Sequence, residues 1–111
     1  MTGGQTVPEV PVSAVPENGW LLDVREPHEW AAGHAPEARH IPLAELGLRS
    51  AEIPADEMVY VICRSGVRSA RAVQALTGAG WQAVNVAGGM QDWRAAGRPM
   101  ISDSGIHPTV A

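Results

Sequence analysis

The chain alternates short apolar runs with segments of helical character, and this pattern predicts strands separated by helices. Three apolar runs have the length and the β-branched content of strands, at 20–24, 58–62 and 81–86. Three helical segments are predicted after them, at 26–32, 69–76 and 90–96. Each of these strands is therefore followed by a helix.

Weaker patterns complete the series. The proline-rich stretch 7–11 fits only a short edge strand, because proline cannot donate a hydrogen bond to a central ladder. We also expect a brief helix at 12–17, a very short strand at 40–41, a short helix at 43–48 and a loop at 49–57. Strands that alternate with helices form mainly parallel sheets. The predicted fold is thus α/β, with a mainly parallel five-stranded sheet covered by helices on both faces.

Cys63 is the only cysteine, and it lies between the strand 58–62 and the helix 69–76. A helix N-terminus carries partial positive charge and free N–H groups, which stabilise an anion. Gly66 lets the intervening loop curl, and Arg64 and Arg68 add positive charge. Ser69 is expected to cap the helix. The pattern favours a reactive thiolate over the alternative, an inert buried cysteine that closes a core strand.

A second polar group follows the strand 20–24. Ligands of open parallel sheets bind outside the carboxyl ends of the strands, so Asp23 and Cys63 could line one pocket. Asp23 either faces that pocket or caps the next helix. Arg25 either pairs with Glu29, four residues later, or contacts substrate. Trp30 either forms a wall of the pocket or belongs to the core.

Composition narrows the function classes. The chain of 111 residues is long enough for one domain, and its net charge of −4 argues against a nucleic-acid-binding surface. No apolar stretch approaches the roughly 20 residues that cross a bilayer, so no membrane partner is expected. A single cysteine can form neither an internal disulfide nor a multi-thiolate zinc site. The N-terminus lacks the features of a signal peptide, so the expected compartment is the cytoplasm.

The chain is expected to divide into three parts. Residues 1–6 form a flexible N-terminus and residues 7–100 form the domain. Residues 101–111 form a C-terminal extension. Because the tail shows no clear periodicity, we expect it to be loosely attached.

Three motifs resemble those of single-domain rhodaneses, a family of sulfurtransferases. The central one is the heptapeptide Cys63, Arg64, Ser65, Gly66, Val67, Arg68 and Ser69, which resembles the family's active-site loop. The N-terminal one comprises 22–25, 29–30, 33–34 and 41–42, and the C-terminal one comprises 86–90, Trp93 and 96–97. The resemblance as a whole spans about 7–100. Glu37 departs from the pattern, since the family usually has glycine there.

The resemblance implies a three-layer rhodanese-like fold and a two-step transfer. Cys63 takes a sulfane sulfur from a small anionic donor such as thiosulfate, and the persulfide passes it to cyanide or a thiol. The loop from Arg64 to Ser69 would stabilise the persulfide, and Arg64 and Arg68 would attract the donor. No metal or organic cofactor is required. An alternative is a sulfur-relay or binding module whose acceptor is a partner protein.

A cysteine-dependent phosphatase or arsenate reductase is the nearest enzymatic rival. Protein tyrosine phosphatase loops place an arginine six positions after the cysteine, where this chain has Ser69. Arg68 stands one residue too early, and the shorter loop makes a tighter cradle. The spacing therefore favours sulfur over a phosphoryl group.

Overall fold

The computed structural model describes residues 7–111; residues 1–6, expected to be flexible, lie outside the described residues. Five strands form one sheet in the order β1-β5-β4-β2-β3, and every neighbouring pair is parallel. The strands are β1 (Glu9–Val10), β2 (Trp20–Asp23), β3 (Arg39–His40), β4 (Val59–Ile62) and β5 (Ala83–Val86). The predicted α/β class is confirmed, and the proline-flanked strand β1 lies at an edge, as proline requires.

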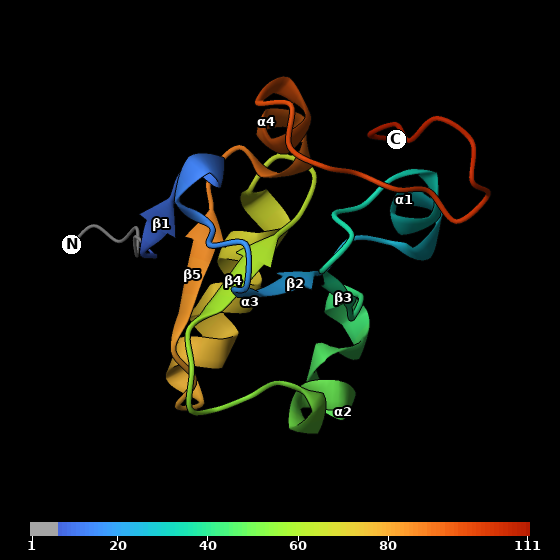
Figure 1. The fold of residues 1–111 in the computed structure, drawn as a ribbon. Coiled ribbons are helices and arrows are strands. Elements are labelled where there is room, and N and C mark those ends of the chain that lie inside the picture. The colour runs from blue at the N-terminus through green and yellow to red at the C-terminus, as the bar shows by residue number, and fades with distance from the viewer. Residues whose placement is uncertain (1–6) are drawn as a thin grey trace.

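Four α-helices and three short 3₁₀ turns accompany the strands, and the last helix, α4, follows β5 (Figure 1). The helices are α1 (Pro27–Ala32), α2 (Leu46–Arg49), α3 (Val67–Gly78) and α4 (Gly89–Ala95). The 3₁₀ turns are η1 (Val12–Ala14), η2 (Leu43–Glu45) and η3 (Ser50–Glu52). The turn η3 lies inside the predicted loop 49–57. Helix α3 begins two residues earlier than predicted, so part of the cysteine loop is helical.

Side chains of the central strand alternate between two core clusters, one on each face of the sheet. Val59, Val61 and Cys63 share a cluster with Val73 and other residues of α3. Ile62 points the opposite way and belongs to the cluster that contains Trp93 of α4. Because successive side chains of a strand point to opposite faces, this register directs Cys63 toward α3.

None of the helices in residues 7–111 is both long enough and apolar enough to cross a bilayer. The helix α3 buries one apolar face against the sheet instead. Val73 and Leu76 of α3, for example, are 0% and 3% exposed. Each such side chain contributes roughly 1.5–3 kcal/mol by leaving water, so the sheet and its helices stabilise one another.

The C-terminal segment packs against the end of α1, which corrects the expectation of a loosely attached tail (Figure 1). Ile101 and His34 exchange two backbone hydrogen bonds of 2.9 Å, and the Thr109 N–H donates to the Ala32 carbonyl at 2.9 Å. A Cβ added to Gly33 would lie 2.3 Å from the Thr109 carbonyl oxygen. Val110 of the tail also packs against the core cluster that contains Trp93. Backbone bonds, a missing side chain and one valine give the tail no hydrophobic period.

Candidate active site

Cys63 follows the last residue of the central strand and faces the first turn of α3. The residue is only 1% exposed. The strand β4 lies between β5 and β2, so its carboxyl end opens among the loops of three neighbouring strands. This is the edge of a parallel sheet at which ligands bind.

Two donors from the loop and α3 converge on the sulfur. The Gly66 N–H lies 3.1 Å from Cys63 Sγ, and the Ser69 hydroxyl oxygen lies 3.2 Å from it. Gly66 has φ of 108°, in the left-handed region, and it is the N-cap of α3. A side chain would be strained at this φ, so glycine lets the loop turn its amide onto the sulfur.

These contacts lower the pKa of the Cys63 thiol below its ordinary value. Burial of the sulfur acts in the opposite direction and raises the pKa. The hydrogen bonds from the Ser69 hydroxyl and from the N–H groups of Ser69, Gly66 and Ser65 outweigh burial because they stabilise the thiolate. The site therefore favours the nucleophilic form of the sulfur.

Ser69 does not cap the helix as predicted. Gly66 occupies the N-cap position and no side chain caps it, because α3 begins at Val67. Ser69 instead lies inside the first turn, fully buried, with its hydroxyl against the sulfur. Ser69 thus contacts Cys63 directly and does not cap the start of α3.

The N-terminus of α4 holds the start of the cysteine loop. The Met90 N–H donates to the Cys63 carbonyl at 2.8 Å, and the Gln91 N–H donates to the Arg64 carbonyl at 3.1 Å. Gly89 permits this approach, since an added Cβ would lie 2.3 Å from the Cys63 carbonyl oxygen. The Gly88–Gly89 pair therefore serves the site as well as the chain turn.

The two arginines of the loop have different surroundings. Arg68 makes a two-pronged ion pair with the Glu29 carboxylate of α1, at 2.6 and 2.8 Å. Arg64 is exposed and its Nε donates to the Ala111 carbonyl at 3.0 Å. Within the described part of the chain, no Asp or Glu side chain lies at ion-pair distance from Arg64. Arg68 thus fastens α3 to α1, whereas Arg64 is paired with no side-chain carboxylate.

Asp23 and Arg25 form a buried ion pair with each other, an arrangement that was not among the alternatives weighed for either residue. Both side chains are 0% exposed, and Arg25 Nη2 lies 2.7 Å from Asp23 Oδ2. Asp23 does not cap α1, whose N-cap is Glu26. Arg25 donates to the carbonyl of Glu29, not to its carboxylate, and to the Gly33 carbonyl. The pair locks the connection between β2 and α1.

Trp30 belongs to an aromatic stack. Its ring stacks on those of His34 and His40, with centroid distances of 3.5 and 4.7 Å and nearly parallel planes. It is half-buried and is in neither core cluster. The other loop residues, Ser65 and Val67, are exposed beside the sulfur.

Sequence reasoning missed Asn85 on β5 and the role of Glu29. Asn85 is 1% exposed and bonds to both Ser69 and Gly66. A signal existed, because an amide inside the apolar run 83–86 has to find buried partners. Glu29 could not be paired with Arg68 from the sequence, since 39 positions separate them.

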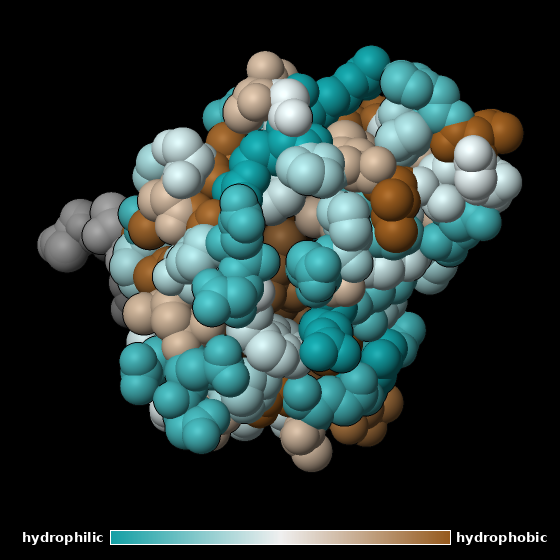
Figure 2. Space-filling model, viewed as in Figure 1, coloured by the Kyte–Doolittle hydropathy of each residue, from teal (hydrophilic) through white to brown (hydrophobic). Residues whose placement is uncertain are grey.

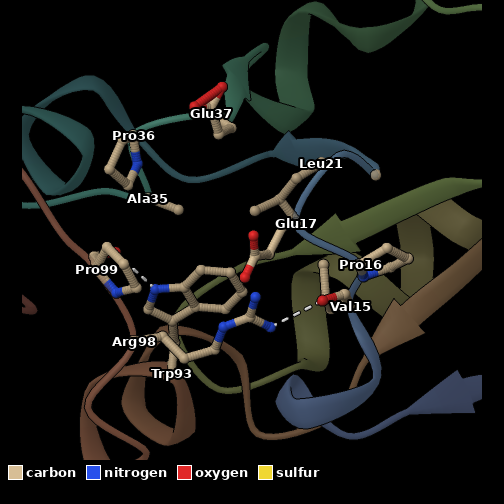
Figure 3. A pocket seen from close by; sticks show the side chains of 11 residues that line it. Val15, Pro16, Glu17, Leu21, Ala35, Pro36, Glu37, Trp93, Arg98 and Pro99 are labelled. Carbon is tan, nitrogen blue, oxygen red and sulfur yellow. Dashed lines mark hydrogen bonds between the residues drawn. The ribbon is translucent and has the colours of Figure 1, made fainter.

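A hollow of about 400 Å³, lined in part by Trp93 of α4, contains no residue of the cysteine loop. The face in Figure 2 is mostly polar, with apolar side chains visible in a recess near its centre. Leu21, Trp93 and Arg98 line the hollow, with Glu17 and the unusual Glu37 (Figure 3). The Arg98 guanidinium lies 4.2 Å from the centre of the Trp93 ring and bonds to backbone carbonyls, so its charge is already engaged. The donors around Cys63, not this hollow, mark the candidate site.

Comparisons with known proteins agree with this geometry. The model of the rhodanese-like domain matches residues 12–96. A sulfurtransferase of Allochromatium vinosum is 37% identical over 90 residues, which cover 80% of this chain and 84% of that protein. A rhodanese-related protein from Thermoplasma volcanium has a TM-score of 0.79 at 35% identity, covering 85% of this chain and 97% of that one.

Two relatives from Bacillus subtilis, YqhL and YrkF, are 46% and 42% identical over 74 residues. YrkF is provisionally named a sulfur carrier protein. The match covers 66% of this chain but only 59% of YqhL and 40% of YrkF. The family match nevertheless extends over residues 12–96, which is most of the described chain. This chain belongs to the rhodanese-like domain family.

Proposed function

We propose that this protein is a sulfurtransferase that carries a sulfane sulfur on Cys63 as a persulfide. The observation that carries the proposal is the convergence of the Gly66 N–H and the Ser69 hydroxyl on the sulfur, at 3.1 and 3.2 Å. These hydrogen bonds lower the pKa of the Cys63 thiol, so the site supplies a thiolate nucleophile without a histidine base. The sulfurtransferase of Allochromatium vinosum supports the same chemistry.

In the first proposed step, the Cys63 thiolate attacks the outer sulfur of a donor such as thiosulfate. A new sulfur–sulfur bond forms to Cys63 Sγ, and the bond between the outer sulfur and the sulfonate sulfur breaks. Sulfite leaves with the electron pair, and the negative charge remains on the outer sulfur of the persulfide. The exposed guanidinium of Arg64 would attract the dianionic donor, and the loop amides would hold the persulfide anion.

In the second proposed step, an acceptor attacks the outer sulfur. Cyanide carbon forms a bond to that sulfur, thiocyanate departs, and the Cys63 thiolate is regenerated. A thiol acceptor would react in the same way and leave as a persulfide. No electron is lost or gained by the protein across the cycle, so no redox cofactor is needed.

A partner protein is the second candidate acceptor. Ser65 and Val67 are exposed beside the sulfur, so a large acceptor could approach the cysteine loop from solvent. The loop does not lie inside the 400 Å³ hollow, so the hollow does not restrict this approach. The name of YrkF supports such a relay. We propose the cytoplasm as the compartment, because reducing conditions keep a lone thiol free.

The test is thiocyanate formation from thiosulfate and cyanide by the purified protein. We expect turnover by the wild type and none by Cys63→Ser, whose hydroxyl is a far weaker nucleophile. Circular dichroism of both proteins checks that the fold is intact. A folded wild-type protein without turnover would exclude the thiosulfate-to-cyanide reaction. Recovery of a mixed disulfide between Cys63 and an acceptor protein would then favour the relay.

A further inference from the structure

Asn85 joins the cysteine loop to the edge of the sheet through both ends of its amide. Its Nδ2 donates to the Gly66 carbonyl at 3.1 Å and to Glu9 Oε2 of β1 at 3.0 Å. Its Oδ1 accepts from the Ser69 hydroxyl. Among the described residues, Ser69 is the only donor to this oxygen. The side chain is 1% exposed, so water cannot readily replace a lost partner.

The Ser69 hydroxyl has one proton to donate and lies near two acceptors, Cys63 Sγ and Asn85 Oδ1. Its oxygen lies 3.2 Å from Cys63 Sγ and also within hydrogen-bonding distance of Asn85 Oδ1. A hydroxyl has a single O–H donor, which can point fully at only one of them. A charged sulfur is the stronger acceptor, and an uncharged sulfur is the weaker one. The charge on Sγ thus decides which bond forms.

We propose that Asn85 is a positioning residue that acts through Ser69, holding the hydroxyl proton while Sγ is uncharged and yielding it to Sγ in the thiolate. When the thiol ionises, its proton goes to solvent and the Ser69 O–H turns from Asn85 to the sulfur. When the persulfide forms, the charge moves to the outer sulfur and the O–H returns to Asn85. The inference rests on the proposed function for this last step only.

One consequence is that Asn85 opposes the free thiolate. Ionisation leaves Oδ1 without its donor in a buried place, which costs free energy that the thiol and persulfide states do not incur. Charged groups near the sulfur are Arg64 in the loop, Arg68 on α3 and Glu29 on α1, while Glu9 of β1 contacts Asn85. None of these groups offers a proton to Oδ1. The effect of Oδ1 on the thiolate should therefore act through Ser69.

The test is a double-mutant cycle read by the rate of thiol alkylation with iodoacetamide as a function of pH. Below the midpoint of the thiol titration, Asn85→Leu should react about fivefold faster than the wild type, because the Ser69 O–H is then free for the thiolate. In a Ser69→Ala background, the same substitution should change the rate by less than about twofold. An equal effect in both backgrounds would mean that Asn85 only shapes the loop and would overturn the proposal, as would an unchanged or slower rate of the single variant.

Glu9→Gln is the matched control. Glutamine keeps a carbonyl oxygen for Asn85 Nδ2 and leaves the Ser69–Asn85 contact in place, so its rate should stay within about twofold of the wild type. A rise as large as that of Asn85→Leu would assign the effect to support of the amide by Glu9 and overturn the shared-proton account. Alkylation uses no sulfur donor, so these rates are informative even if the protein fails to turn over thiosulfate.

A measurement on the unsubstituted side chain covers the case in which Asn85→Leu does not fold. The carbon-13 shift of the Asn85 side-chain carbonyl should titrate with the midpoint of the Cys63 β-carbon. In Ser69→Ala it should no longer follow that midpoint. An Asn85 signal that ignores the cysteine titration in the wild type would overturn the proposal.

Discussion

The carboxyl ends of β2 and β4 lie side by side and carry polar groups of very different character. At the end of β2, Asp23 and Arg25 are wholly buried and satisfy each other's charge. At the end of β4, Cys63 is almost as buried, but two hydrogen-bond donors point at its sulfur. Both ends occupy the edge at which parallel sheets bind ligands.

The comparison of the two strand ends shows that burial of a polar group does not by itself indicate a reactive site. The charges of Asp23 and Arg25 are neutralised by each other, so the ion pair serves to hold β2 and α1 together. The sulfur is surrounded by donors whose best partner is an anion, and the protein can supply that anion by losing a proton. We therefore expect substitutions at the β2 end to change stability and those at the β4 end to change reactivity.

The largest expected effect is on stability, from Asp23→Ala. Removing one partner leaves the Arg25 guanidinium buried without its counter-charge, which should lower the free energy of unfolding by about 3–5 kcal/mol. Denaturant unfolding measures this. The alkylation rate of Cys63 per folded molecule should stay within about twofold of the wild type.

Cys63→Ser gives the opposite pattern, with lost transfer activity and a stability change below about 1 kcal/mol. If Asp23→Ala destabilised the protein by less than Cys63→Ser, the two ends would not differ as described. Should Asp23→Ala fail to fold, Asp23→Asn keeps the shape of the side chain and removes only its charge.

A smaller effect is expected from Glu29→Gln, which weakens the link between the two regions. The bond from Arg68 lowers the pKa of the Glu29 carboxyl from 4.5 to about 2; burial opposes this, and the Glu26 N–H adds to the lowering. A depressed folded-state pKa contributes stability above the unfolded pKa, and this contribution is lost as pH falls from 4.5 toward 2. At neutral pH the variant should be about 1–2 kcal/mol less stable.

The pH profile provides the check. The difference in unfolding free energy between the wild type and Glu29→Gln should shrink across that acidic range, because the wild-type carboxyl becomes protonated. Glu57→Gln, at an exposed loop position, serves as the control. A stability difference that stayed constant between neutral and acidic pH would show that the charge of Glu29 is not what Arg68 uses.

Much of the fold could be predicted from the sequence, because β2, β4 and β5 are apolar runs with a helix after each. Their parallel order followed from the same alternation. The tail could not be predicted, since it is held by backbone bonds near Gly33 and shows no apolar period. The turn η3 also has no pattern long enough to detect.

Within the site, the sequence predicted the cysteine loop and its converging amides. It could not predict how charges pair across the fold. Asp23 and Arg25 stand at the end of a strand, where ligands commonly bind, so they were candidates for a pocket. That their side chains turn toward each other and are buried depends on the folded structure and could not be predicted from the sequence. The two arginines of the loop also looked equivalent until the position of Glu29 distinguished them.

The smallest expected effect concerns that distinction. Arg64→Ala should raise KM for thiosulfate by about fivefold, because it removes an exposed positive charge that is paired with no side-chain carboxylate. Arg68→Ala should lower stability more than it raises KM, since its charge is committed to Glu29. Steady-state kinetics at several thiosulfate concentrations separates KM from kcat. Equal increases in KM for the two variants would contradict the assignment.

Whether Cys63 carries a sulfane sulfur is decided by the intact mass of the protein after incubation with thiosulfate and removal of the excess donor. We expect the wild type to gain the mass of one sulfur atom on Cys63 and to lose it on addition of cyanide. Asp23→Asn should gain the same mass and Cys63→Ser should gain none. An unchanged wild-type mass with thiosulfate and with other sulfane donors would exclude a Cys63 persulfide.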